Sequence, residues 1–173
     1  MLFRDRRDAG TQLAARLLHL RGADVVVLGV PLGGVPVAAE VATALGAPLD
    51  VVVVRKLGVP AQPELAMGAI GEGGVRVIND DVVRAVGVSD AVIAGVEAHE
   101  RAELERRVRR LRGDGPHLPL EGRTALIVDD GIATGSTAAA TCRVVRLQHP
   151  ARIVLAVPAR RARAPPRRRS PRR

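Results

Sequence analysis

Aromatic side chains are almost absent from this sequence: its 173 residues include one Phe, Phe3, and neither Trp nor Tyr. Proteins that bind single-stranded nucleic acid without base preference stack the bases on aromatic rings, so this chain lacks the usual platform for that binding. Its core has to be built from Val, Leu, Ile and Ala instead. A Val-rich core of this kind is typical of parallel strands buried on both faces.

Cysteine and long apolar runs are scarce as well. Cys142 is the single Cys, which excludes an internal disulfide and a metal site with several Cys ligands. The N-terminal "MLFRDRRDAG" is charged within four residues and lacks the apolar core of a signal peptide. No uninterrupted apolar run approaches the ~20 residues that a membrane helix needs. We therefore expect a cytoplasmic protein in a reducing setting, with no membrane partner.

The positive charge is concentrated at one end of the chain. The formal net charge is +9, but residues 159–173, "ARRARAPPRRRSPRR", contain eight Arg and no acidic residue. The remainder is therefore close to neutral, and the basicity belongs to a tail. The composition of residues 159–173 is typical of disorder. We predict one folded domain over residues 1–158 and a disordered tail over residues 159–173.

Three interpretations of this tail stay open. It is a basic arm for RNA or membrane phospholipid, an inert disordered end, or the product of a frame change in GC-rich coding sequence that replaced the natural C-terminus. A contact with nucleic acid is expected only through this tail. Under the third interpretation the sheet of the folded domain is incomplete at the C-terminus and one of its edges is open.

Strand and helix patterns alternate along the rest of the chain, after a first helix over residues 5–21. One βαβ unit is predicted over residues 25–55, with strands at 25–30 and 50–55 and a helix at 35–45. A second is predicted from "RTALIVDD" through "STAAATCRVVRLQ" to "ARIVLAVP". This alternation predicts an α/β fold, a three-layer doubly wound sheet of mainly parallel strands.

The segment between the two units contains Gly and Pro at intervals over residues 57–88. The "GEGG" in "MGAIGEGGVRVIN" predicts the turn of a hairpin. A long helix follows, with Ser89 or Asp90 as its N-cap and Gly113 as its end. Charges of both signs alternate in its second half, which favours a solvated helix over one that binds nucleic acid.

Ligands in open α/β sheets bind at the carboxyl ends of the strands, here residues 31–34, 55–58 and 129–137. In "IVDDGIATGSTAAA" the helix that begins near Ser136 offers free backbone N–H groups and a positive dipole end, which favour a phosphate. Asp129 and Asp130 repel anions but accept hydrogen bonds from hydroxyls. A ribose 5-phosphate matches both features, because its phosphate suits the start of the helix and its hydroxyls suit the two acids. The alternative, that the acids organise a turn and the small residues only pack a helix on a sheet, explains the whole arrangement less well.

"ALIVDDGIATGST" closely resembles the phosphoribosyl pyrophosphate (PRPP) binding motif of type I phosphoribosyltransferases. The resemblance implies that Asp129 and Asp130 bind the ribose 2- and 3-hydroxyls. It also implies a loop that holds the 5-phosphate, made of Ala133, Thr134, Gly135, Ser136 and Thr137.

Two further segments carry the resemblance. "GVPLGGVPVAAEVA" is similar to the loop that binds pyrophosphate, which commonly contains a non-proline cis peptide. This assigns Leu32, Gly33 and Gly34 to the pyrophosphate. "VVVVRKLGVPAQPELAMGAI" resembles the second strand end, where the basic pair Arg55 and Lys56 faces the phosphates. The alternative for this pair is a plain solvated turn.

One position departs from the family pattern. Many relatives place Arg or Lys in the pyrophosphate loop where this sequence has Leu32. The site therefore lacks one cation for a highly charged leaving group, while the backbone donors of Gly33 and Gly34 remain. We expect PRPP binding to be weakened rather than abolished.

The resemblance implies an enzyme that transfers ribose 5-phosphate from PRPP to a nitrogenous base or related acceptor and releases pyrophosphate. Mg²⁺ would bridge the pyrophosphate and ribose oxygens, and Asp129 and Asp130 would reach it mostly through PRPP. The catalytic candidates are Asp129, Asp130 and Lys56, which act by positioning and electrostatic stabilisation. The family also implies a homodimer and a flexible loop, here within residues 57–122. The alternative function is a non-catalytic regulatory protein that binds PRPP or a nucleotide.

Overall fold

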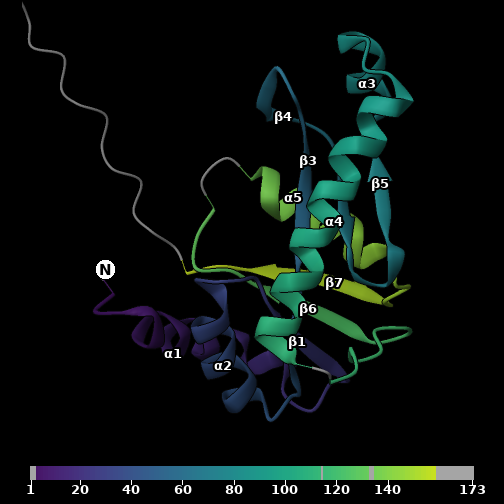
Figure 1. Cartoon of the computed structure of the whole chain (residues 1–173). Coiled ribbons are helices and arrows are strands. Elements are labelled where there is room, and N and C mark those ends of the chain that lie inside the picture. The colour runs from purple at the N-terminus through teal and green to yellow at the C-terminus, as the bar shows by residue number, and fades with distance from the viewer. Residues whose placement is uncertain (1–2, 114, 133–134, 159–173) are drawn as a thin grey trace, which may run out of the picture.

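The computed structural model describes residues 3–113, 115–132 and 135–158, without the side chain of Ser136 (Figure 1). Its main sheet has four parallel strands in the order β2-β1-β6-β7. The strands are β1 (Val25–Gly29), β2 (Leu49–Val51), β6 (Thr124–Val128) and β7 (Arg152–Ala156). The predicted α/β class and the mainly parallel sheet are confirmed.

Alternate residues of the central strands face two separate cores. Val25 and Val27 of β1 pack with α1 (Arg6–Leu17), the 3-10 turn η1 (Leu18–Leu20) and α2 (Gly34–Leu45). Val26 and Leu28 face the other side, where they pack with Val145 at the end of α5 (Ser136–Arg146). Helices therefore cover both faces, which gives the predicted three layers.

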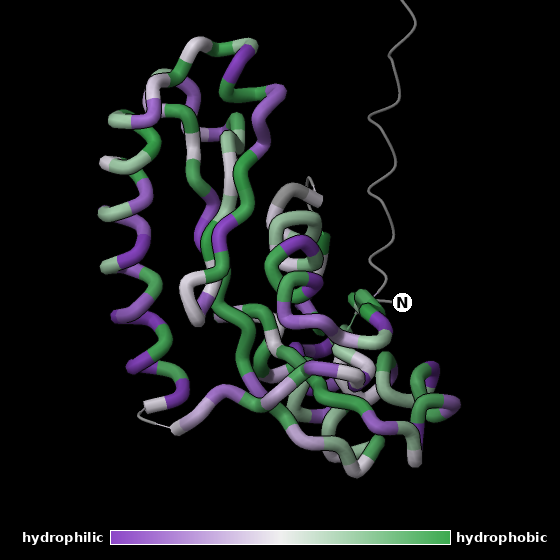
Figure 2. The backbone as a smooth tube through the Cα atoms, turned by 90° about the vertical axis from the view of Figure 1, so that its right-hand side faces the viewer, coloured by the Kyte–Doolittle hydropathy of each residue, from purple (hydrophilic) through white to green (hydrophobic). Residues whose placement is uncertain are grey.

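A second sheet, of three antiparallel strands, stands beside the first (Figure 2). Its strands are β3 (Val54–Val59), β4 (Gln62–Gly71) and β5 (Arg76–Ile78), followed by α3 (Asp80–Val86) and α4 (Asp90–Arg112). The β4–β5 hairpin, with the 3-10 turn η2 (Glu72–Gly74) between its strands, confirms the predicted turn at "GEGG". The hairpin of β3 and β4 is an addition that the sequence pattern did not indicate.

The predicted strand over residues 50–55 is wrong as a single element. β2 pairs with β1 only from Leu49 to Val51, and the chain then passes through Val52 and Val53 into β3 of the other sheet. Both valines of this link are buried, because each sheet supplies a core beside them. A continuous Val run therefore serves two sheets.

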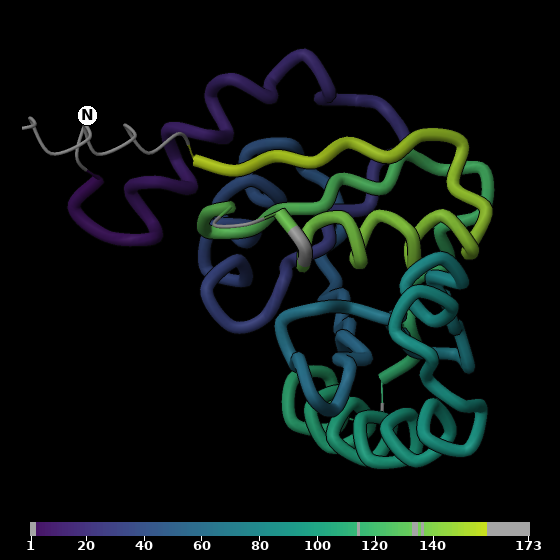
Figure 3. The backbone as a smooth tube through the Cα atoms, turned by 90° about the horizontal axis from the view of Figure 1, so that it is seen from above, coloured from purple at the N-terminus to yellow at the C-terminus, as the bar shows by residue number. Residues whose placement is uncertain are grey.

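α4 has the limits that its capping residues predict. The Ser89 hydroxyl accepts a hydrogen bond from the Val92 N–H, and Gly113, with φ of 69°, ends the helix. Figure 3 shows α5 between β7 and α4, and α5 contacts strands of both sheets. The segment in which a flexible loop was predicted is thus largely folded, with an irregular stretch over residues 115–120 of its described part.

β7 is the last strand of the main sheet in the part of the chain that the structure describes. It pairs with β6 alone, and Leu155 near its end is 38% exposed. The predicted tail over residues 159–173 lies outside the described residues. No described helix combines the length and the apolar character needed to cross a membrane.

Candidate functional site

A pocket of about 270 Å³ opens where β1 and β6 end at the same edge of the main sheet. Because the two strands are parallel neighbours, the loops that follow them meet there. The pocket is lined by Val30, Pro31, Leu32, Gly33, Asp129, Asp130, Gly131, Ile132, Gly135, Thr137 and Ala138. It therefore brings together the predicted pyrophosphate loop, the acid pair and the described part of the predicted phosphate loop.

The loop after β1 approaches the acid pair so closely that only glycine fits. A Cβ on Gly33 would lie 2.1 Å from Asp130 Oδ2, and one on Gly34 would lie 2.6 Å from the Val128 carbonyl oxygen. The Gly34 N–H donates to the Val30 carbonyl at 2.9 Å as α2 begins. The peptide between Pro31 and Leu32 is cis, as the resemblance implies for this loop.

The two acids differ in their surroundings. Asp129 is half-buried, and its Oδ1 accepts the Asp130 N–H at 2.8 Å. Burial, with a smaller contribution from the neighbouring Asp130 carboxylate, raises the pKa of Asp129 despite this hydrogen bond. The negative charge of Asp129 is therefore held where water solvates it poorly. A hydroxyl donor or a cation placed there would stabilise it.

Arg6 at the start of α1 contacts the acid pair, which the sequence did not predict. Its Nε and Nη2 lie 3.0 and 2.9 Å from Asp130 Oδ2. The residues are 124 positions apart, and "DRRDAG" belongs to no motif that pairs it with the acids. Only the packing of α1 beside α2 places the guanidinium at the pocket.

α5 begins directly at the pocket, as predicted. Gly135, with φ of 79°, turns the chain into the helix, and Thr137 lines the pocket. The unpaired N–H groups of a first helical turn and the positive end of the dipole favour an anion at this point. Ala133 and Thr134, predicted to belong to this loop, lie outside the described residues.

The basic pair, Arg55 and Lys56 of β3, lines a second cavity of about 280 Å³. This cavity adjoins the first pocket and shares Val30, Pro31 and Thr137 with it. Arg55 is committed to an ion pair, with its Nε 2.6 Å from Glu100 Oε2 of α4. Lys56 is freer, since its Nζ is 3.5 Å from a carboxylate oxygen of the exposed Glu64.

A third cation at this cavity is Arg107 of α4, which the sequence prediction of a solvated helix missed. Its Nε lies 2.9 Å from Glu103 Oε1. The helix periodicity gave no sign of it, because the contact depends on how α4 packs against β3. All three predicted strand ends thus border one connected region.

The family model described as "Phosphoribosyl transferase domain" matches residues 5–172. The chain belongs to the phosphoribosyl transferase domain family.

Two Mycobacterium tuberculosis proteins, from strains CDC 1551 and H37Rv, are 62% identical to this phosphoribosyl transferase domain over 157 residues. Their names assign them provisionally as phosphoribosyl transferases. The match covers 91% of this chain and 35% of each relative, so the chain spans about a third of their length.

Solved structures share the fold of this chain. The crystal structure of TT1426 from Thermus thermophilus has a TM-score of 0.79 and 45% identity, over 91% of this chain and 74% of that one. A hypoxanthine-guanine phosphoribosyltransferase from Bacillus anthracis has a TM-score of 0.52 and 12% identity, over 88% and 66% of the two chains. The second likeness concerns the fold alone.

The donor set of this phosphoribosyl transferase domain fits Mg²⁺ carried by a ligand. Among the described residues, no group of three or more His, Cys, Asp and Glu is arranged to hold a metal ion. Asp129 and Asp130 supply hard carboxylate oxygens to the lining of the pocket. Mg²⁺ commonly binds to one or two carboxylates together with substrate phosphates and water, and these residues meet that requirement.

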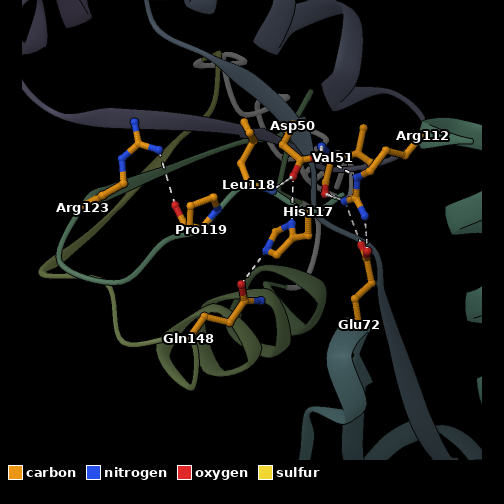
Figure 4. Close-up of polar contacts among 9 residues, drawn as sticks. All are labelled: Asp50, Val51, Glu72, Arg112, His117, Leu118, Pro119, Arg123 and Gln148. Atoms are coloured by element: carbon orange, nitrogen blue, oxygen red, sulfur yellow. Dashed lines mark hydrogen bonds and ion pairs between the residues drawn. The ribbon is translucent and has the colours of Figure 1, made fainter. Parts of the chain in front are cut away.

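A second carboxylate cluster, away from this pocket, surrounds Asp50 of β2 (Figure 4). Its side chain is 5% exposed. Each oxygen accepts two hydrogen bonds of 2.7 to 2.9 Å, from Val51 N and Arg112 Nε on Oδ1 and from His117 Nδ1 and Leu118 N on Oδ2. Arg112 also pairs with Glu72, and His117 Nε2 lies 2.5 Å from Gln148 Oε1. We assign this Asp50 cluster a structural role, since every lone pair has a partner.

Proposed function

We propose that this domain binds PRPP with Mg²⁺ and transfers its ribose 5-phosphate to a nitrogen acceptor, with release of pyrophosphate. The observation that carries the proposal is the meeting of an acid pair with the start of α5 in one pocket. The acids suit ribose hydroxyls, and the helix start suits the phosphate attached to the same sugar.

Each part of the ligand has a matching surface. The ribose hydroxyls would donate to Asp129 and Asp130. The 5-phosphate would receive hydrogen bonds from the loop of residues 133–137, of which Gly135 and Thr137 line the pocket. The pyrophosphate would lie along the backbone of Gly33 and Gly34, where the missing side chains allow close approach.

The chain's own residues would act mainly by position and charge. Bond cleavage at C1 leaves positive charge on the sugar and negative charge on the pyrophosphate. Asp129 and Asp130 would hold the ribose and favour its cationic form, while Lys56 and Arg55 would stabilise the leaving group. Mg²⁺, when bound with PRPP, supplies further positive charge to the pyrophosphate.

A non-catalytic PRPP-binding regulatory protein is the second candidate. It is favoured by Leu32, which is 74% exposed at the pocket and adds no charge to the pyrophosphate loop. The acceptor is a nitrogenous base or a related compound. Phe3 is the single Phe, Tyr or Trp side chain in the sequence, which leaves few large aromatic rings to stack on a base.

The test is to mix the protein with PRPP, Mg²⁺ and a panel of purine and pyrimidine bases and to follow pyrophosphate. The catalytic proposal predicts release with at least one base, reduced about 100-fold or more in Asp129→Asn with Asp130→Asn. Binding of PRPP without release from any base would favour the regulatory candidate. A wild-type protein that bound no PRPP by calorimetry would exclude both.

A further inference from the structure

The proposed PRPP pocket is short of positive charge. Its described lining residues include two carboxylates, Asp129 and Asp130, and no Lys or Arg. Leu32 contributes an apolar side chain where a cation would face the pyrophosphate. PRPP and pyrophosphate both carry several negative charges, so a pocket with this lining needs a cation from outside it.

Arg6 provides a cation at the mouth of this pocket. Two of its nitrogens contact Asp130 Oδ2, at 3.0 and 2.9 Å. The same carboxylate group lies against Gly33, where a Cβ would be 2.1 Å from Oδ2. A single carboxylate therefore separates the guanidinium from the pyrophosphate loop.

The backbone of Arg6 is held in place from both sides. The Asp5 side chain caps α1 by accepting the Asp8 N–H at 2.8 Å. Gly10 allows α1 to approach α2 closely, since a Cβ there would lie 2.8 Å from Glu40 Cβ and 2.9 Å from the Val37 carbonyl oxygen. α2 begins where the pyrophosphate loop ends, so the helix that carries Arg6 is packed against the helix that continues the loop.

The side chain of Arg6 retains donors for a ligand. It is 61% exposed, and Asp130 occupies only its Nε and Nη2. A guanidinium has five N–H donors in a planar fork, which suits phosphate oxygens. Arg6 can therefore keep its contact with Asp130 and still donate to an anion from its other nitrogen.

We propose that Arg6 is a binding residue of the pyrophosphate subsite and replaces the cation that position 32 lacks. In the empty pocket it neutralises Asp130. With ligand bound, Arg6 donates a hydrogen bond to an oxygen of the pyrophosphate group, while Asp130 accepts a hydrogen bond from a ribose hydroxyl. The inference rests on the proposed function, because it assigns a residue to the ligand of that site.

The test compares Arg6→Gln with Arg7→Gln by calorimetry, using Mg²⁺-pyrophosphate and, separately, ribose 5-phosphate. Arg7 is the exposed neighbour in the same helical turn, so the control removes the same charge one position away. Loss of a charge-assisted contact predicts about tenfold weaker pyrophosphate binding in Arg6→Gln and less than about twofold in Arg7→Gln. Ribose 5-phosphate affinity should change less than about threefold in either variant.

A rescue variant separates binding from folding. Adding Leu32→Lys to Arg6→Gln should restore most of the pyrophosphate affinity, because it returns a cation to the loop. Thermal unfolding would verify that all variants fold. Equal loss of affinity for both ligands, or no gain from Leu32→Lys, would overturn the proposal and leave Arg6 as a support for Asp130.

The same measurements distinguish a failure of the Arg6 assignment from a failure of the proposed function. If the wild-type protein binds Mg²⁺-pyrophosphate and Arg6→Gln binds it equally well, the inference about Arg6 fails and the proposed function stands. If the wild-type protein binds neither PRPP nor Mg²⁺-pyrophosphate, the proposed function fails and the inference fails with it.

Discussion

Asp50 and Asp129 are both buried or half-buried carboxylates at strands of the main sheet, yet their environments are opposite. Burial alone would raise the pKa of Asp50, but hydrogen bonds from His117, Leu118 and Arg112 outweigh it and hold the pKa well below its usual range. For Asp129, burial is the largest effect and the pKa is raised. Donors of the protein fully compensate the charge of Asp50, whereas within the described part of the chain Asp129 has one donor, the Asp130 N–H.

The difference separates structure from function at the level of single residues. The Asp50 cluster joins five segments of the chain and leaves its carboxylate 5% exposed. The acid pair borders a pocket, and among the described residues one backbone N–H donates to Asp129. A fully satisfied buried charge stabilises a fold, whereas an incompletely satisfied one beside a cavity is a candidate for ligand binding.

The largest expected effect lies in the Asp50 cluster. Arg112→Ala removes the guanidinium that the buried carboxylate of Asp50 and the half-buried carboxylate of Glu72 share. The free energy of unfolding should fall by about 3–5 kcal/mol, measured by urea denaturation followed by circular dichroism. Arg110→Ala, at an exposed position of the same helix, should change it by less than about 0.5 kcal/mol.

Substitution of the acid pair should weaken ligand binding and leave the stability of the fold intact. Asp129→Asn with Asp130→Asn should weaken PRPP binding by about 100-fold, close to 2.7 kcal/mol, because the ribose hydroxyls lose charged acceptors. The free energy of unfolding should not decrease. Calorimetry and urea denaturation on the same protein would compare the two quantities. A variant that loses both would place the acid pair with the Asp50 cluster.

A smaller effect should appear in the pH dependence of stability. The hydrogen bond to Asp50 raises the pKa of His117 against the opposing effect of burial. The stabilisation from protonated His117 is therefore complete below the unfolded pKa of about 6.5 and declines as pH rises through the folded value. His117→Asn should cost about 1 kcal/mol at pH 5.5 and less at pH 8.5.

The control for this pH dependence is His99→Asn, at an exposed position of α4. The difference in unfolding free energy between it and the wild-type protein should be the same at pH 5.5 and pH 8.5. If His117→Asn lowered the free energy of unfolding by the same amount at pH 5.5 and at pH 8.5, the assigned positive charge of His117 would be contradicted.

The smallest effect concerns Asp129 alone. Because its pKa is raised on folding, its ionised form opposes folding at neutral pH, and the penalty disappears once pH falls below the unfolded pKa of about 3.9. Asp129→Asn should therefore raise Tm at pH 7 by about 1–2 °C while it weakens PRPP binding. Differential scanning calorimetry at pH 7 and pH 3 would measure the gain and its loss.

Several elements could be predicted because their signals are local. Ser89 and Gly113 mark the ends of α4, and "GEGG" marks a hairpin. The division of residues 50–55 between two sheets could not, since four consecutive Val residues contain no break. The division arises because β2 pairs with β1 for only three residues, after which the chain enters β3 and pairs with β4.

The candidate site divides in the same way. Asp129, Asp130 and the start of α5 are neighbours in the chain, and the carboxyl ends of parallel strands meet at one edge, so their association follows from sequence. Arg6 and Arg107 come from distant helices, and no spacing connects them to the strand ends.

The sequence by itself determined the parallel main sheet, the acid pair and the helix start that follows it, because periodicity, caps and a contiguous motif act over a few residues. Only the tertiary structure decided which charges are compensated. It brought Arg112, His117 and Leu118 to Asp50, placed Arg6 on Asp130, and left Asp129 beside a pocket. Electrostatic environment depends on distance in space and on burial, and neither is encoded by position along the chain.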